Sequence, residues 1–239
     1  MGRHRQFRAP RVRAVDRQTL VFDADDTLWE NNVLFERVVE SYLDWLAHPT
    51  LDRSAIRAVL DDVERANVPV HGYGSASFLR SLHDAFEKLS ERPATEAERA
   101  EITDLASALV NHEVELVPGV AETLAELGTR HDLLLLTKGA QKEQQRKIDA
   151  SNLAHHFRSV HIVAEKRVPT YRSLITEQGL TPASTWMIGN SPASDIVPAR
   201  AVGMGAVFIP NAHTWVLEHD EVPADVLTLE RFPDLLHHF

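Results

Sequence analysis

Cysteine is absent from this chain of 239 residues, and no apolar run is long enough to cross a membrane. The lack of cysteine excludes a disulfide scaffold, a zinc site built on thiolates and a cysteine nucleophile, and it fits a reducing cytoplasm. A membrane-spanning helix needs roughly 18 or more consecutive apolar residues. We therefore expect a cytoplasmic protein with no membrane as partner.

An excess of positive charge is also missing, because the formal net charge is -10. We therefore expect no nucleic acid among its partners. The basic stretch is residues 1–17, which hold six arginines against a single acid. We interpret it as an N-terminal tail rather than as an arm for an anionic partner, since it offers little apolar surface to bury. It has no apolar core of signal-peptide length, so secretion is not indicated.

Short apolar runs indicate the strands of a parallel sheet. They show no polar alternation, which is typical of strands covered on both faces. Amphipathic helical patterns separate them, and such strand–helix alternation predicts an α/β fold with a Rossmann-like, doubly wound parallel sheet. The expected strands are residues 19–23, 133–137, 160–163, 186–189 and 206–209, with 226–229 as a possible sixth.

The alternation is interrupted between residues 31 and 115, where no strand pattern occurs. Four sets of apolar residues at helical spacing lie there, and Thr95 with Glu98 forms a capping box before the last of them. We interpret this block as an all-helical second domain inserted after the first strand. The predicted organisation is a tail at 1–17, a core at 18–30 and 116–239, and the helical insertion at 31–115.

Three carboxylates follow the first strand in "VFDADDTLWENN", namely Asp23, Asp25 and Asp26. Two such charges ~5 Å apart at an effective dielectric constant of ~20 repel each other by roughly 3 kcal/mol. In an extended chain, Asp23 and Asp25 point to one side and Asp26 to the other. A divalent cation would offset the repulsion, and Mg²⁺ prefers such oxygen ligands. The alternative is a solvated acidic turn.

Polar groups also follow the next three predicted strands. "LLLLTKG" ends at Thr137, "VHIVAEK" leads to Lys166, and "WMIGNSPASD" leads to Asn190 and Asp195. Open α/β sheets bind ligands at the carboxyl ends of their strands. A hydroxyl, an ammonium, an amide and carboxylates meeting at that edge favour a site for phosphate and a metal over four unrelated surface residues.

These motifs resemble those of the haloacid dehalogenase superfamily, in its phosphatase branch. "DADDT" is similar to the first signature of the family through Asp23, Asp25 and Thr27, "LLLLTKG" to the second, and "GNSPASD" to the fourth. The resemblance spans about residues 19 to 210, and the helical insertion is similar to the family's α-helical cap. It implies a Rossmann-like core that is closed by this cap.

Two positions depart from the family pattern. The third motif usually has lysine directly before proline, whereas "EKRVPTY" separates Lys166 from Pro169, so Arg167 competes for the role of Lys166. The fourth motif usually begins Gly-Asp, whereas this chain has Gly189 followed by Asn190. The second departure makes the predicted metal site less acidic.

The resemblance implies hydrolysis of a small phosphorylated metabolite in two steps. Asp23 would attack phosphorus, and Asp25 would first protonate the leaving oxygen and then activate water. Mg²⁺ would be held by Asp23, the Asp25 carbonyl, and Asn190 or Asp195. Asp26 is interpreted as a loop residue. The phosphate would be bound by Thr137 and Lys166, with help from Lys138.

Alternatives of other classes are a weakly active or inactive family member that binds a phosphorylated ligand, which Asn190 favours, and a receiver-type signalling domain, which would be half as long. The superfamily's dehalogenases lack the second aspartate, so Asp25 favours a phosphatase.

The segment "HGYGSASF" (71–78), with His71, Tyr73 and Ser75, is our candidate for the substrate contact of the cap; otherwise it is a plain helix connector. The oligomeric state is left open.

Overall fold

A parallel sheet of six strands forms the centre of the protein in a computed structural model that describes residues 17–111 and 113–239. The strand order is β3-β2-β1-β4-β5-β6. The chain therefore moves outward from β1 in one direction and then crosses to the other side at β4, a topology that places a crevice at the ends of β1 and β4. The strands are β1 (Thr19–Phe22), β2 (Asp132–Lys138), β3 (Ser159–Val163), β4 (Thr185–Gly189), β5 (Gly205–Phe208) and β6 (Leu227–Thr228).

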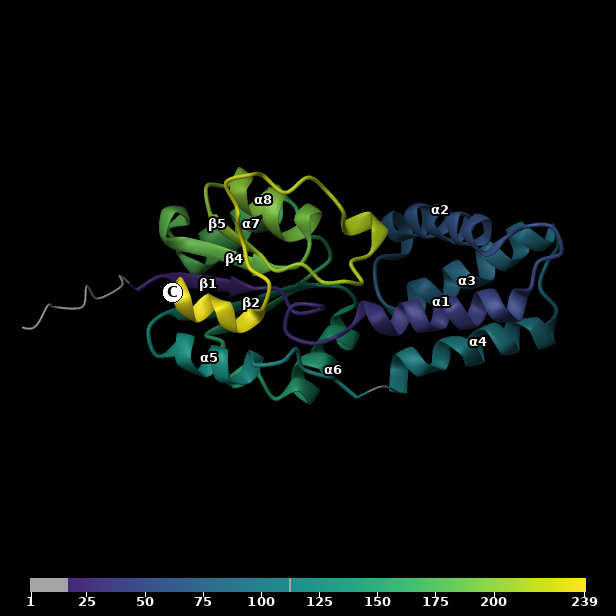
Figure 1. The fold of residues 1–239 in the computed structure, drawn as a ribbon, viewed down its shortest axis with the longest axis horizontal. Coiled ribbons are helices and arrows are strands. Elements are labelled where there is room, and N and C mark those ends of the chain that lie inside the picture. Colours follow the sequence, from purple (N-terminus) through teal and green to yellow (C-terminus); the bar gives the residue numbers. More distant parts are fainter. Residues whose placement is uncertain (1–16, 112) are drawn as a thin grey trace, which may run out of the picture.

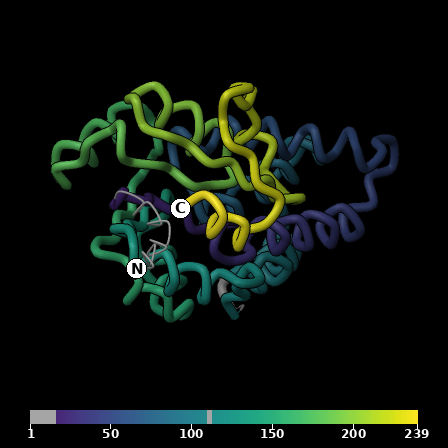
Figure 2. The backbone as a smooth tube through the Cα atoms, turned by 60° about the vertical axis from the view of Figure 1, so that its left-hand side comes forward, coloured from purple at the N-terminus to yellow at the C-terminus, as the bar shows by residue number. Residues whose placement is uncertain are grey.

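Helices cover both faces of this sheet (Figure 1). Leu20 and Phe22 of β1 join one hydrophobic cluster, with α5 (Val120–Gly128), α6 (Gln141–Ser151) and the C-terminal turn η5 (Phe232–His237). Val21 joins the opposite cluster, with α7 (Val168–Gln178) and α8 (Val197–Ala201). The two-residue alternation of a strand thus sends apolar side chains into both layers, which explains why the strands read as continuous apolar runs. The turn η5 packs beside α5, as the yellow end of the tube shows (Figure 2).

Four helices follow β1 and pack on one another at one end of the sheet (Figure 1). They have their own hydrophobic cluster, centred on buried residues such as Tyr42, Leu60, Leu82 and Ile102. We call these helices the cap. They are α1 (Asn32–Leu46), α2 (Arg53–His71), α3 (Ser75–Ser90) and α4 (Glu96–Asn111).

The α/β class and the parallel sheet predicted from the sequence are confirmed, with strand ends shifted by a residue or so. The capping box is present, because Thr95 Oγ1 accepts from the Glu98 amide at 3.3 Å and Glu98 accepts from the Thr95 amide at 2.8 Å. Gly128 is the last residue of α5. Among the described residues, no helix combines the length and apolarity needed to cross a bilayer.

Gly205 of β5 leads to a prediction about stability. A Cβ atom at this position would lie 2.4 Å from the Trp186 ring of the neighbouring strand β4, whereas a Cβ at Gly128 would meet nothing nearer than 3.7 Å. We expect Gly205→Ala to lower the free energy of unfolding by about 1–3 kcal/mol through overpacking. The matched variant Gly128→Ala should change it by less than about 1 kcal/mol. Urea unfolding of both variants measures this, and equal midpoints would contradict the close approach.

Candidate active site

Asp23 lies directly after β1, where its backbone amide still donates to the Ile188 carbonyl of β4 at 2.9 Å. Its carboxylate is buried and accepts two hydrogen bonds, one from the Lys166 ammonium and one from Thr27 Oγ1 at 2.9 Å. The turn that follows the strand positions Thr27 to face back toward Asp23. The carboxylate is therefore fixed at the sheet edge and oriented by two donors.

Lys166 joins Asp23 to a second carboxylate. Its ammonium is buried and also donates to Asp195 at 2.8 Å. Burial lowers the pKa of Lys166, but the negative charges of Asp195 and Asp23 raise it more, so the pKa lies above its usual value. Burial raises the pKa of Asp195 to about 7 although the charge of Lys166 lowers it, and repulsion from Asp23 adds to the rise. Two buried acids share one ammonium.

Solvent exposure distinguishes Lys166 from Arg167, the two candidates for the lysine of the third motif. The side chain of Arg167 is 72% exposed and lies 3.5 Å from Glu165, whereas the side chain of Lys166 is 1% exposed. Lys166 therefore provides the charge at the site although proline does not follow it directly.

Asp195 reaches the site through the turn after β4. The backbone winds into a π-helical turn over Pro192–Ile196, and the Ser191 amide donates to the Asp195 carboxylate at 3.0 Å. A Cβ atom on Gly189 would lie 2.2 Å from that carboxylate. The close packing of Asp195 against the end of β4 therefore requires glycine at position 189.

Asp25 is bound by other donors than those that bind Asp23. Lys147 donates to both carboxylate oxygens at 2.7 Å, Gln144 donates at 2.8 Å, and the Trp29 indole donates at 2.7 Å. Burial would raise the pKa of Asp25, but the charge of Lys147 and these hydrogen bonds lower it below its usual value. The carboxylates of Asp23 and Asp25 are thus held by different partners, Lys166 and Lys147. Both nevertheless line the same cavity.

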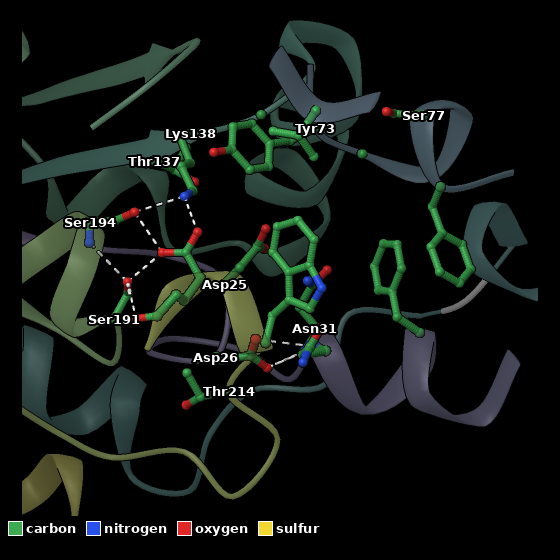
Figure 3. A pocket seen from close by; sticks show the side chains of 18 of the residues that line it. Asp25, Asp26, Asn31, Tyr73, Ser77, Thr137, Lys138, Ser191, Ser194 and Thr214 are labelled. Carbon is green, nitrogen blue, oxygen red and sulfur yellow. Dashed lines mark hydrogen bonds and ion pairs between the residues drawn. The ribbon is translucent and has the colours of Figure 1, made fainter. Parts of the chain in front are cut away.

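Asp26 has a structural role that agrees with its interpretation as a loop residue. It adopts the left-handed conformation with φ of 61°, and its carboxylate accepts from the amides of Asn31 and Asn32 at 2.9 Å (Figure 3). These amides lie at the beginning of α1, where an acid is favourable. Asp26 thus connects the end of β1 to the first cap helix.

Thr137 and Lys138 end β2 beside the same cavity, but Lys138 is held in a network. Its ammonium donates to Ser194 Oγ at 2.7 Å, pairs with Glu218 and lies 4.3 Å from the centre of the Tyr73 ring (Figure 3). Thr137 Oγ1 donates to Gln144 at 3.4 Å. The predicted phosphate-binding residues therefore face the cavity with partners from the core and the cap.

The segment after β5 reaches across to the cap. His213 accepts from the Asn32 side chain through its carbonyl, Trp215 packs edge-on against Tyr73 with ring centres 6.1 Å apart, and Glu218 binds Lys138. We call residues 211–218 the bridging segment. It contacts α1, the α2–α3 connection and the end of β2.

A cavity of about 150 Å³ lies between the core and the cap. It is small compared with the roughly 300–1,000 Å³ of sites for drug-sized ligands, which suits a ligand of few atoms. The "HGYGSASF" segment contributes Tyr73, Ser77 and Phe78 to its wall, whereas His71 is exposed outside it. Ser75 binds Glu143 through its amide and hydroxyl at 3.0 and 2.9 Å.

Oxygen donors at this edge could hold a divalent cation. Within residues 17–111 and 113–239, no three His, Cys, Asp or Glu side chains gather as a metal site. The carboxylate of Asp25 binds Lys147. The carboxylates of Asp23 and Asp195 remain, with the Asn190 amide oxygen 3.4 Å from Thr27 Oγ1. Oxygen ligands in small number are what Mg²⁺ takes from proteins, and the excess negative charge at Asp195 would be offset by such an ion. The residues present therefore fit Mg²⁺.

The sequence analysis missed several residues of this site. Gln144 and Lys147 are three positions apart on α6, so they lie on the same face of this helix. Because α6 follows the strand that ends near Thr137, this spacing could have indicated that both residues face the site. Glu64 of α2, Trp215 and Glu218 gave no comparable signal, because they lie far from any strand end in the sequence.

Comparison with known proteins agrees with this geometry. Residues 18–203 match the profile of haloacid dehalogenase-like hydrolases, and the chain belongs to that family. A solved haloacid dehalogenase-like hydrolase from Xanthomonas campestris is 30% identical, with a TM-score of 0.76 over 87% of this chain and 86% of that one.

Two further proteins are similar to this chain. A phosphoserine phosphatase from Thermus thermophilus is 30% identical over 136 residues, which is 54% of this chain; the match spans about half of that relative, at 53%. The L-2-haloacid dehalogenase from Xanthobacter autotrophicus is 17% identical, with a TM-score of 0.64 over 92% of this chain and 97% of that one. The latter likeness concerns the fold alone.

The pair of acids around Lys166 leads to a second prediction. Lys166→Met should lower the free energy of unfolding at neutral pH by about 3–5 kcal/mol, because it leaves two buried carboxylates without a cation. The exposed residue Lys142 on α6 provides the control, and Lys142→Met should change stability by less than about 0.5 kcal/mol. Chemical unfolding in magnesium-free buffer measures both. Equal stabilities would show that Lys166 does not compensate the acids.

Proposed function

We propose that this hydrolase is a Mg²⁺-dependent phosphatase that cleaves a small phosphate monoester in the cytoplasm through an aspartyl-phosphate on Asp23. The observation that carries the proposal is the pair Asp23 and Asp25, which line one cavity at the end of β1 while each is held by its own lysine. The small cavity supports a metabolite-sized substrate. The absence of cysteine supports the location.

Asp25 is the feature that favours phosphate over halide chemistry. Displacement of a halide releases an anion that needs no proton, whereas an alkoxide leaving group does. A second carboxylate beside the nucleophile, with hydrogen-bonding partners that fix its direction, supplies that function. The name of the Thermus thermophilus relative supports the same choice.

In the first step, a carboxylate oxygen of Asp23 attacks phosphorus, the bond to the ester oxygen breaks, and Asp25 gives its proton to that oxygen, which leaves as the alcohol. Lys166 and Thr27 hold this carboxylate at the sheet edge, which reduces the freedom that it must lose before attack. Thr137 and Lys166 are placed to bind the non-bridging oxygens, and Lys138 can join them by leaving its pair with Glu218.

In the second step, water attacks the phosphorus of the aspartyl-phosphate, and Asp25 accepts the proton of that water. The low pKa of Asp25 keeps it ionised, which suits this step directly. The proton that Asp25 accepts in this step replaces the one that it gives to the leaving oxygen in the first step, so the same carboxyl group serves as acid and then as base.

Asp23, Asp195, the Asn190 amide and the Asp25 carbonyl would hold the metal. When bound, Mg²⁺ supplies charge neutralisation for the transferred phosphoryl group. The second candidate, a binding protein without turnover, rests on Asn190, since an amide in place of a carboxylate weakens a metal site. Measurement of turnover separates the two.

Asp23→Asn should abolish hydrolysis of 4-nitrophenyl phosphate while the melting temperature stays close to that of the wild type, because the substitution removes the nucleophile with little change in volume. A chelator should abolish wild-type activity, and added Mg²⁺ should restore it. The control is Asp149→Asn on the exposed side of α6, which should keep full activity. Turnover by Asp23→Asn would refute the covalent mechanism, and an inactive wild type with Mg²⁺ would favour the binding protein.

Asp25→Asn should slow alkyl phosphates far more than aryl phosphates, because a general acid matters most where the departing oxygen is most basic. We expect a difference on the order of 10²-fold across a leaving-group series. Steady-state rates with matched esters measure it. A uniform decrease across the series would remove Asp25 from the acid role and leave it as base alone.

A further inference from the structure

The cavity carries an excess of negative charge. Eight carboxylates and four basic side chains line it. The three lysines already hold the carboxylates described above, and Arg57 of α2 binds both oxygens of Glu36 at 2.7 and 2.8 Å. Within the described part of the chain, every basic group that lines the cavity is therefore paired, and three of the eight carboxylates have no basic partner of their own. Mg²⁺ and a phosphate dianion bring opposite charges, so their binding leaves this excess unchanged.

Two of the three remaining acids are satisfied by neutral donors. Asp26 accepts from the two backbone amides at the beginning of α1. Glu143 accepts from the amide and hydroxyl of Ser75. Neither acid needs a ligand to complete its hydrogen bonding.

Glu64 of α2 is the third acid, and it differs from the others. It is 8% exposed and lines the cavity, and the one donor that acts on its carboxylate among the described residues is the Trp215 side chain. An ionised carboxylate can accept about four hydrogen bonds. Most of the acceptor capacity of Glu64 is therefore unused in a buried place, which is unfavourable unless a partner arrives.

Arg57 does not supply that partner. Its charge acts on Glu64, but its hydrogen bonds go to Glu36 and, through Nε at 2.9 Å, to Asp61. Burial raises the pKa of Glu64 to about 7 in spite of Trp215 and Arg57, with repulsion from Asp61 and Glu36 adding to the rise. Among the described residues, no cation is therefore in direct contact with the Glu64 carboxylate.

Apolar side chains of the cap form the wall around Glu64. Phe35, Val39, Val68 and Phe78 line the cavity together with it. A ligand that contacts both Glu64 and the sheet edge therefore shares the cavity with these hydrocarbon side chains, which suits a short aliphatic stem. The small volume of the cavity limits that stem to a few atoms.

We propose that Glu64 determines substrate specificity by binding a primary ammonium on the organic part of the ester, and that the preferred substrates carry no second anionic group. The first half follows from a buried carboxylate without a cation in contact, and the second from the pairing of every basic side chain that is described in the cavity. The inference rests on the proposed phosphatase function and names the substrate class of the same site.

The test compares esters that differ in one group, with the full chain and Mg²⁺. Values of kcat/KM are measured for phosphoethanolamine, ethylene glycol monophosphate and phosphoserine, with 4-nitrophenyl phosphate as a reference for phosphatase activity. We expect phosphoethanolamine to exceed the glycol ester by at least about tenfold, and to exceed phosphoserine as well. In Glu64→Gln the advantage over the glycol ester should fall to less than about threefold.

The control is Asp62→Asn, which removes the same charge from the exposed side of α2, where Asp62 pairs with Arg65, and should keep the advantage. If Glu64→Gln has a much lower melting temperature than the wild type, Glu64→Asp is measured in its place. Glu64→Asp should still prefer phosphoethanolamine to the glycol ester. Equal rates for phosphoethanolamine and the glycol ester in an enzyme active on the aryl ester would overturn the inference alone. A preference for phosphoserine would overturn its second half. Inactivity on all four esters would instead overturn the proposed phosphatase function.

Discussion

The Lys166 ammonium allows two acids from different strands to occupy one buried position. Asp23 follows β1 and Asp195 follows β4, and without a shared cation their repulsion would push the two strand ends apart. Much of the local architecture follows from this pairing. Gly189 has to lack a side chain so that Asp195 can approach, and the start of α7 has to bring Lys166 inward. The site and the sheet are therefore stabilised by the same contacts.

The sheet was predictable from the sequence because its physical cause is local. Each strand is covered on both faces, so each appears as an uninterrupted apolar run, and the polar residue that follows marks its carboxyl end. Once the strands are parallel, these ends must converge on one edge. Asp23, Thr137, Lys166 and Asp195 were found in this way, although their contacts were not. The choice between Lys166 and Arg167 needed the structure, since spacing alone permits either.

The remaining parts of the site depend on where side chains turn after a strand has ended. The left-handed conformation of Asp26 begins the turn that leads to α1, and the partner of Asp25 is Lys147 of α6, which lies more than a hundred positions away along the chain. Glu64 and Glu218 come from a cap helix and from the segment after β5. Nothing in their own neighbourhoods indicates the cavity, because only the packing of the cap on the core brings them to it.

The bridging segment (211–218) makes the cap and the core depend on each other mechanically. Its contacts reach Asn32 of α1 and Tyr73 of the α2–α3 connection on the cap, and Lys138 at the end of β2 on the core. Separation of the cap from the core must therefore break the contacts of this segment on one side or the other. Trp215 also binds Glu64. A substitution in this segment therefore acts on the entry and exit of ligands and on the choice of ligand together. During evolution, turnover rate and substrate range would be difficult to change independently, because residues of the same short segment affect both.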